Sequence, residues 1–427
     1  MSPATSTTSP GPSAPPVSLH SSRPRLPLVV YVLAVGTFLM LTTEFVVAGI
    51  LPEIAVDLGV SLGRAGSLIT VFAIGMVVGA PLMTLLTMRM SKKLTLVLAL
   101  LVFVAGHVFV ALGTDLATAK TARFVTALAT GAFWAVSTVV AAQAAGPSMG
   151  ARAVGIVGAG GSLATVLGVP IGALLAQHIG WRGTFWALGG AATVAVFFIA
   201  RLVPADAPRR KSSSSVLSEL ADLRSGRLWL VLAACLTTCG GVLATYSFIA
   251  PVLTDQAGVP SSLVPLVLTG FGIGSFVGTL TGGRLGDSHP HVVTIVTPAV
   301  TTVVLLAMAL STGSAWITVA LVVVLGLFGL SANMVLIHLA VGFAGRAATL
   351  GSGLSVAAFN AGTAIGTAIA GTALATPLGL AGPATVGTAI VALTLVPTIV
   401  LGLVSRADER HCEGERSHRR ELRRSGT

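Results

Sequence analysis

The sequence predicts an all-α membrane protein with twelve transmembrane helices in two pseudo-symmetric six-helix bundles, and three observations support this. Hydrophobic residues make up 54% of the 427 residues and charged residues only 9%, whereas soluble domains carry about 25% charged residues. Apolar runs of about 20 residues, long enough to cross a bilayer as helices, recur along the chain. A shift of 199 residues aligns part of the first half with part of the second.

The apolar runs are separated by charged residues, Pro or Gly, which mark the expected helix ends. The predicted spans are 28–50, 65–87, 94–113, 118–145, 153–176, 184–203, 228–250, 263–285, 291–312, 316–341, 350–374 and 383–405. They define the predicted domains: a disordered cytoplasmic tail at 1–26, an N-terminal bundle at 27–203, a cytoplasmic linker at 204–227, a C-terminal bundle at 228–405 and a basic cytoplasmic tail at 406–427.

The distribution of Lys and Arg predicts the orientation of the spans. If the N-terminus is cytoplasmic, 21 of the 25 basic residues fall on the cytoplasmic side, including seven arginines from Arg406 onward. Arg64, Lys120 and Arg182 fall on the other side, and Arg123 falls within a span. Because cytoplasmic loops carry the excess of basic residues, both termini are expected in the cytoplasm. The net charge of +11 therefore reflects topology, and we expect no nucleic-acid partner.

The 199-residue shift also indicates how the two halves are related. Residues 50–88 and 249–287 share eleven identities in 39 positions, among them Pro52 with Pro251 and Gly59 with Gly258. The helix-breaking Pro and the Gly75-x-x-x-Gly79 pair, repeated as Gly274-x-x-x-Gly278, are the informative identities because they set backbone geometry and helix contacts, so they indicate a shared fold. Six spans repeated in the same orientation give two parallel bundles with a site between them near the middle of the membrane.

Glu44 lies within the first predicted span, roughly 9 Å from its second end if the helix continues to Pro52. Every other acidic residue is predicted in a loop, a tail or a helix end. A carboxylate at that depth costs several kcal/mol unless it is protonated, paired or facing water. Inside a membrane such a group can carry protons. The repeat places Leu243 at the equivalent position of the second half, so we expect proton coupling in the first half alone.

Several motifs resemble the twelve-helix drug:proton antiporters of the major facilitator superfamily, over about residues 28–405. They are Thr43-Glu44-Phe45 with Gly49 to Ser61, Gly168-Val169-Pro170-Ile171-Gly172 with Gly180 to Phe185, and Ala358-Phe359-Asn360 to Gly366. Within that family, actinobacterial chloramphenicol-resistance exporters look most similar. The loop between the second and third helices departs from the family pattern. Thr84 and Met88 replace its Gly and Asp, and Ser288 stands where the second copy usually has Arg.

The resemblance implies roles for particular residues. Arg123 matches an intramembrane Arg that the family links to proton transfer, although from the sequence it could instead reach the outer surface. Helices one, four, seven and ten line the cavity in this superfamily. The resemblance therefore implies proton coupling by Glu44 and Arg123, and a substrate pocket of Phe45, Phe133, Trp134, Tyr246, Asn333, His338 and Asn360. It also implies gating by Arg89, Lys92, Lys93, Gly168, Pro170, Gly283 and Asp287. His107 is assigned to packing.

The expected function is proton-coupled export of an amphipathic small molecule, such as chloramphenicol, across the bacterial plasma membrane. Export of an arabinose-type sugar or of a purine or nucleoside is the alternative. A multi-span membrane enzyme would need a cluster of acids, His or metal ligands at one membrane face, which the loops lack. We expect a monomer whose partners are substrate, protons and membrane lipids, with no enzymatic activity, cofactor or metal.

Overall fold

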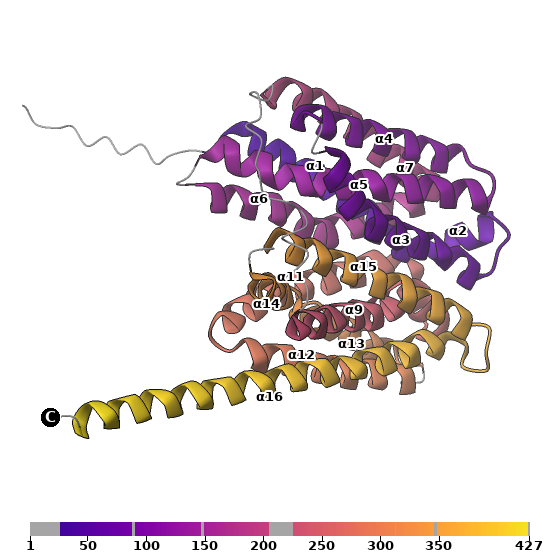
Figure 1. Ribbon diagram of the computed structural model, residues 1–427. Coiled ribbons are helices and arrows are strands. Elements are labelled where there is room, and N and C mark those ends of the chain that lie inside the picture. The colour runs from indigo at the N-terminus through magenta and orange to yellow at the C-terminus, as the bar shows by residue number, and fades with distance from the viewer. Residues whose placement is uncertain are drawn as a thin grey trace, which may run out of the picture.

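The computed structural model describes residues 26–87, 90–146, 149–204, 225–311, 313–345 and 348–425. Within these ranges the chain forms helices and short connections, without strands (Figure 1). The first half contains α1 (Leu28–Gly49), α2 (Leu51–Asp57), α3 (Leu62–Thr87), α4 (Lys92–Leu112), α5 (Leu116–Ala145), α6 (Gly150–Leu163), the π-helical turn η1 (Ala164–Gly168) and α7 (Val169–Leu202). The second half contains α9 (Gly226–Tyr246), α10 (Ile249–Pro251), η3 (Val252–Gln256), η4 (Ser261–Leu263), α11 (Val264–Ser288), α12 (Pro290–Leu310), α13 (Ala315–Gly329), α14 (Asn333–Phe343), α15 (Ala348–Ala373), η6 (Gly379–Ala381) and α16 (Gly382–Ser425).

These helices give twelve membrane spans. The described residues hold 11 helical stretches that are long and apolar enough to cross a bilayer. One of them, Arg152–Leu202, has 51 residues and is interrupted by Gly180, whose φ of 76° is not helical. Since about 20 residues suffice for one crossing, this stretch is two spans that meet at Gly180. The predicted fold class is therefore confirmed.

Helix ends mostly lie within a few residues of the predicted ones, and local capping explains several of them. Ser91 accepts a hydrogen bond from Leu94 N at 3.2 Å and starts α4. Asp115 accepts one from Thr118 N at 2.9 Å and starts α5, because a side-chain oxygen satisfies an otherwise unpaired backbone N–H. Two predicted spans are broken. The chain leaves the helix after Tyr246, and the predicted span 316–341 is divided into α13 and α14 at 330–332.

The internal repeat has a structural counterpart at the ends of α1 and α9. Pro52 lies in the first turn of α2, and Pro251 lies in α10 at the equivalent place after α9. Gly59 and Gly258, which follow, have φ of 60° and 68°. A positive φ is readily adopted by Gly alone among the common residues. The aligned Pro and Gly residues thus build the same turn in both bundles.

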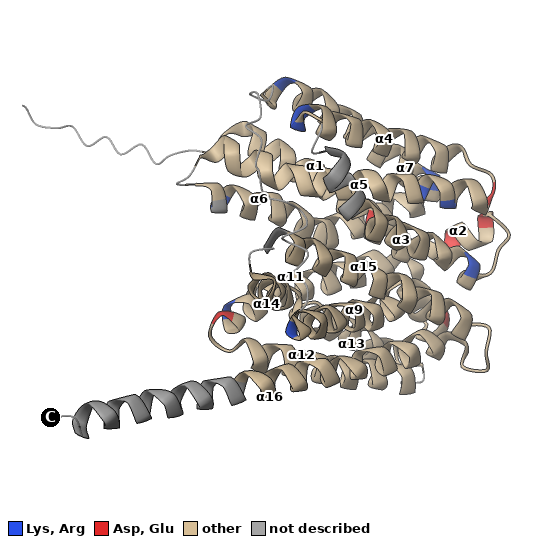
Figure 2. Ribbon diagram, in the orientation of Figure 1, with Lys and Arg blue, Asp and Glu red and all other residues tan. Residues whose placement is uncertain are grey.

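The two bundles lie side by side, the first indigo to magenta and the second pink to yellow in Figure 1. The side of the membrane at which α1 begins, and toward which α16 runs, is called the terminal face here; α2 lies at the opposite face (Figure 1). Charged residues are found mainly near the two ends of the bundles (Figure 2). Helices α3 and α15 pack against each other across the bundle interface, as do α7 with its π-helical turn and α11.

Candidate functional site

A cavity of about 240 Å³ lies between the bundles and contains Glu44. Its first-bundle lining comes from α1, α3 and α5, and its second-bundle lining comes from α9, α14, α15 and the break before α14. Most lining side chains are apolar, and Glu44, Asn333, Asn360 and Thr363 supply oxygen or nitrogen atoms. Leu243, the repeat equivalent of Glu44, lines the same cavity. The two equivalent positions therefore contribute to one site, and one of them carries an acid.

The cavity extends from Glu44 toward the terminal face. Helix α1 begins at the terminal face, and the lining residue Leu41 comes before Glu44 on it. Helices α3 and α5 run toward the terminal face, and the lining residues Met76 and Trp134 lie in their second halves. Cys239 and Val356 likewise precede Leu243 and Asn360 on helices that begin there. The lining thus continues on the terminal side of Glu44.

At the opposite face the bundles are in direct contact. Thr70 on α3 and Thr367 on α15 share a hydrogen bond of 2.8 Å, and Gln177 Nε2 donates to Ser261 O at 2.6 Å. A Cβ added to Gly63 would collide with the backbone of Gly371. The bundles are therefore in contact toward the opposite face, and the cavity that contains Glu44 extends toward the terminal face.

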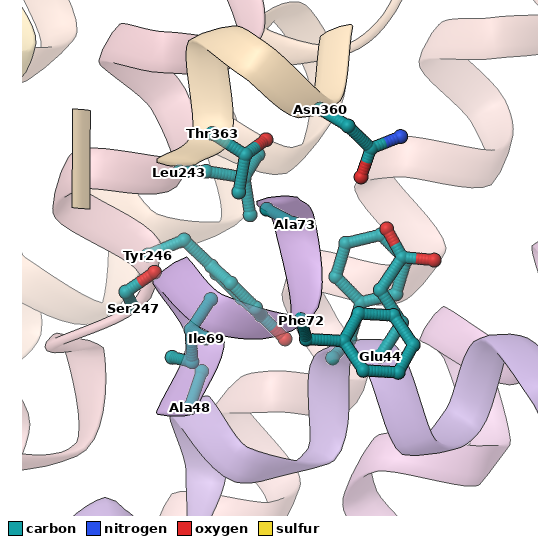
Figure 3. A pocket seen from close by; sticks show the side chains of 11 residues that line it. Glu44, Ala48, Ile69, Phe72, Ala73, Leu243, Tyr246, Ser247, Asn360 and Thr363 are labelled. Atoms are coloured by element: carbon teal, nitrogen blue, oxygen red, sulfur yellow. The ribbon is translucent and has the colours of Figure 1, made fainter. Parts of the chain in front are cut away.

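A smaller void, of about 10 Å³, adjoins Glu44 on the side of the opposite face (Figure 3). In Figure 3 the amide of Asn360 points toward the Glu44 carboxyl, and Tyr246 and Ser247 lie across the void. Tyr246 stacks on Phe271 with ring centroids 4.3 Å apart. Its hydroxyl and that of Ser247 are buried, and neither has a hydrogen-bond partner among the residues that the structure describes. A void of this size, lined by polar groups, has room for about one water molecule.

Arg123 on α5 is 1% exposed and lies outside both cavities. Its Nη1 donates to Thr43 O at 2.6 Å and to Thr43 Oγ1 at 3.1 Å. The guanidinium carbon lies 4.2 Å from the centroid of the Phe72 ring, a favourable position for a cation. Arg123 therefore does not reach the outer surface. Within the described residues no ion pair joins Arg123 to Glu44. The guanidinium is bound instead by Thr43, the residue before Glu44.

His107 on α4 takes part in the same cluster, which its assignment to packing did not foresee. The ring stacks on Phe103 with centroids 3.9 Å apart, as packing requires. Its Nε2, however, lies 2.9 Å from Thr43 Oγ1, and its Nδ1 lies 2.8 Å from Phe103 O. Thr43 and Phe72 are the other members of the cluster that the sequence did not single out. An intramembrane hydroxyl beside a lone acid was the available signal for Thr43.

Five of the seven predicted pocket residues line the cavities: Phe45, Trp134, Tyr246, Asn333 and Asn360. The other two, Phe133 and His338, are not among the residues that line either cavity. Phe133 is fully buried, and a Cβ on Gly36 of α1 would collide with its ring, so Phe133 fills the contact between α1 and α5. His338 is exposed on α14, one turn after Met334, which lines the larger cavity.

The comparisons with known proteins agree with this geometry. The model of the Major Facilitator Superfamily matches residues 33–260. A chloramphenicol resistance protein of Streptomyces lividans is 35% identical over 373 residues, which are 87% of this chain and 95% of that protein. The chain belongs to the major facilitator superfamily. It is a multi-pass membrane transporter and not an enzyme, and the predicted resemblance to actinobacterial chloramphenicol-resistance proteins is confirmed.

Other members of the superfamily are similar to this chain. The putative transporter AraJ of Escherichia coli (strain K12) is 30% identical over 341 residues, 78% of this chain and 84% of that protein. The solved structure of the nucleoside transporter NupG has a TM-score of 0.73 at 13% identity and covers 88% of this chain and 98% of that one. A bacterial homologue of the lysosomal transporter Spinster, in an inward-facing conformation, has a TM-score of 0.65 at 15% identity and covers 89% and 94%. These likenesses show the shared fold.

One superfamily-like motif, at Gly180 to Phe185, builds a cluster at the opposite face. Trp181 Nε1 donates to Asp57 Oδ2 at 3.2 Å, and Arg182 forms an ion pair with the same carboxylate. Arg182 also donates to Gly113 O at 3.0 Å and lies 4.3 Å from the Trp181 ring centroid. The hydrogen-bonded Arg182 guanidinium holds the pKa of the Asp57 carboxyl below its ordinary value. The motif thus ties α2 to the end of α4 and to the Gly180 break.

The predicted gating residues occupy varied positions. Arg89 lies outside the described residues. Lys92 Nζ donates to Gln143 Oε1 at 2.6 Å, and Lys93 is half-buried at the start of α4. Gly283 and Asp287 lie near the end of α11 at the terminal face, where Asp287 is exposed. These positions are compatible with contacts at the terminal face in another conformation.

Gly168 and Pro170 lie where the fifth span packs on α1. Gly168 ends the π-helical turn η1, and Pro170 lies in the first turn of α7. A Cβ on Gly168 would collide with Thr42 of α1, and one on Gly172 would collide with Val46. π-Helical turns are often found at functional sites. Among the residues described, no group of three His, Cys, Asp or Glu is arranged to hold a metal ion.

Proposed function

We propose that the protein is a proton-coupled antiporter that exports neutral amphipathic small molecules, including chloramphenicol, across a bacterial plasma membrane. The observation that carries this proposal is a single carboxyl, Glu44, in a mostly apolar cavity between two bundles. In this reading the terminal face is cytoplasmic, as the excess of basic residues there favours, and the structure is open to the cytoplasm.

The cavity lining supports the substrate class. A pocket with many apolar side chains and a few polar anchors suits a molecule with an apolar body and hydrogen-bonding groups. Trp134, Met76 and Phe359 offer apolar surface, and Asn333 and Asn360 offer amides. A sugar would need many more polar partners, because each buried hydroxyl without a partner is costly. The name of the Streptomyces lividans relative agrees with a drug as substrate.

Proton coupling follows because the proton and the substrate use the same site, the cavity at Glu44. In the conformation open to the cytoplasm, Glu44 releases its proton and the substrate enters the same cavity. After the bundles rock and the cavity opens outward, a proton from outside neutralises Glu44 and the substrate leaves. The protonated carboxyl carries no charge, so the empty transporter returns without the cost of moving a bare charge through a closed apolar site. One proton enters the cell for each substrate that leaves.

Arg123 contributes a fixed positive charge in this scheme. Its guanidinium is bound to the backbone carbonyl of Thr43, one residue from Glu44, and it remains buried. A cation in an environment of low polarity acts on a nearby carboxyl more strongly than it would in water. Arg123 would therefore favour release of the Glu44 proton when the cavity opens to the cytoplasm, without forming a direct ion pair.

Expression in a bacterium that lacks its own efflux pumps tests the function and separates the substrate classes. We expect resistance to chloramphenicol and related amphenicols, lost when an uncoupler collapses the proton gradient. The Glu44→Gln variant should remain in the membrane but confer no resistance, because it cannot exchange a proton. Glu53→Gln, the same change on α2 outside the cavity, is the matched control and should retain resistance.

Three outcomes contradict the proposal. Full resistance in the Glu44→Gln variant would remove the proton-carrying role. Resistance that survives the uncoupler would remove proton coupling. Relief of sugar or nucleoside toxicity without any effect on amphenicols would favour metabolite export, the second candidate.

A further inference from the structure

The hydrogen-bonding directions around His107 are fixed by its partners. Phe103 O can only accept, so His107 Nδ1, at 2.8 Å, is the donor. In the neutral ring Nε2 is then an acceptor, and the hydroxyl of Thr43, at 2.9 Å, donates to it. The same hydroxyl oxygen accepts from Arg123 Nη1 at 3.1 Å. A proton on Nε2 would set a second cation against Arg123 across one hydroxyl, which disfavours the charged ring.

Thr43 differs from its neighbours in how its hydroxyl is used. Thr42 donates to Phe38 O at 2.7 Å, and Thr126 donates to Ala122 O at 2.7 Å. This bond to the carbonyl four residues back is the usual choice for Thr in a membrane helix. Thr43 donates to His107 on another helix instead. Without an acceptor at His107, the hydroxyl of Thr43 would be free to turn to its own helix and lose the geometry that receives Arg123.

The imidazole is held firmly enough to act as a fixed acceptor. His107 is 2% exposed, stacks on Phe103 and lies 5.6 Å from Phe185, centroid to centroid. The preceding residue, Gly106, brings α4 close to α5, since a Cβ there would collide with Thr126. The ring of α4 thus contacts α1 through Thr43 and α7 through Phe185, and the Thr43 hydroxyl links it to Arg123 of α5.

We propose that His107 is a positioning residue for proton coupling: through the Thr43 hydroxyl it holds the Arg123 guanidinium against the backbone beside Glu44. This inference rests on the proposed function and deepens it, because it assigns a role to a helix that does not line the cavity. The charged groups of this region are Arg123 and Glu44, and His107 sets where the first of them acts on the second.

The test uses the full chain in proteoliposomes with chloramphenicol as the probe. His107→Leu fills the site without an acceptor, and His107→Gln offers a side-chain oxygen near the position of Nε2. We expect His107→Leu to lower accumulation driven by a pH gradient at least about tenfold, while the Kd for chloramphenicol stays within about twofold. His107→Gln should restore at least about half of the accumulation. A purely structural role of the ring would not be rescued by Gln and would change binding as well.

Variants of Thr43 test the same proposal in the same assay. Thr43→Val should reproduce the His107→Leu loss, Thr43→Ser should retain accumulation, and the double variant His107→Leu with Thr43→Val should be no worse than either single one. Additive losses, or failure of His107→Gln to rescue, would overturn the positioning role. If Glu44→Gln abolishes accumulation and His107→Leu does not, that role fails and the proposed function stands. If the wild-type chain does not accumulate chloramphenicol, the proposed function fails first and the inference falls with it.

Discussion

Arg123 is held by the backbone of the residue before Glu44 and not by Glu44 itself. The sequence was sufficient to select both side chains, because charged residues within a predicted span are costly and rare. It could not give their arrangement, since that depends on which side of α1 faces α5. Thr43 and Glu44 are neighbours in the chain but lie on different sides of α1: Thr43 meets Arg123 and His107, and Glu44 meets the cavity.

Asp57 carries a prediction at the residue scale. Its pKa is lowered from 3.8 by the hydrogen-bonded Arg182, so the stabilisation is present above the unfolded value and is lost as the pH falls through the lower folded value. Because the pair is exposed, its contribution is at most about 1 kcal/mol. Asp57→Asn should therefore lower the Tm of the purified protein by about 1–3 °C at pH 7, and the difference should shrink as the pH falls below 3.8 and vanish once the pH is below the lowered pKa of the folded state. Asp255→Asn, an exposed acid at the same face, is the control and should show no such pattern. A Tm difference that persists in acid would contradict the account.

For the helices, the sequence predicted the first and last residues well wherever the length of an apolar run determines them. The limits of α1, α4, α12 and α15 lie within two residues of the predictions, because charged and helix-breaking residues stand at the membrane borders. The breaks at 247–248 and 330–332 were not predicted, since both lie within long, mostly apolar runs and no Pro lies at either break. The break before Asn333 divides a stretch that was predicted as one continuous span.

Gly63 on α3 tests the closure of the opposite face. A methyl group at this position would meet the backbone of Gly371 on α15, so Gly63→Ala should favour the conformation in which that face is open. The measurement uses a chain in which Cys235 and Cys412 are replaced by Ser, so that Cys239 in the cavity is the thiol that reacts. With Gly63→Ala, Cys239 should react with a maleimide applied from the terminal face at least about threefold more slowly than without it. Gly158→Ala is the matched control, because an added Cβ there meets no atom within 4 Å. Unchanged labelling in Gly63→Ala would mean that this contact does not set the closed state.

Across the whole molecule the duplicated scaffold serves different purposes in the two bundles. Phe72 and Phe271 occupy equivalent positions, yet Phe72 lies against Arg123 and Phe271 stacks on Tyr246. Glu44 and Leu243 are also equivalent and line one cavity. The first bundle therefore holds the charged groups at and beside the cavity, and the second contributes amides, a phenol and apolar surface to it. A rocking motion about the cavity would expose the same carboxyl to each face in turn.

The most direct test of this account is the coupling of the two gradients in proteoliposomes that contain the purified chain. A proton gradient should drive chloramphenicol uphill, and a chloramphenicol gradient should drive protons the other way, as a pH-sensitive dye in the lumen would report. In the Glu44→Gln variant both fluxes should be lost, while exchange of labelled for unlabelled chloramphenicol continues. Proton movement that persists in Glu44→Gln, or chloramphenicol transport by the wild type without proton movement, would contradict the central claim that Glu44 is the coupling group.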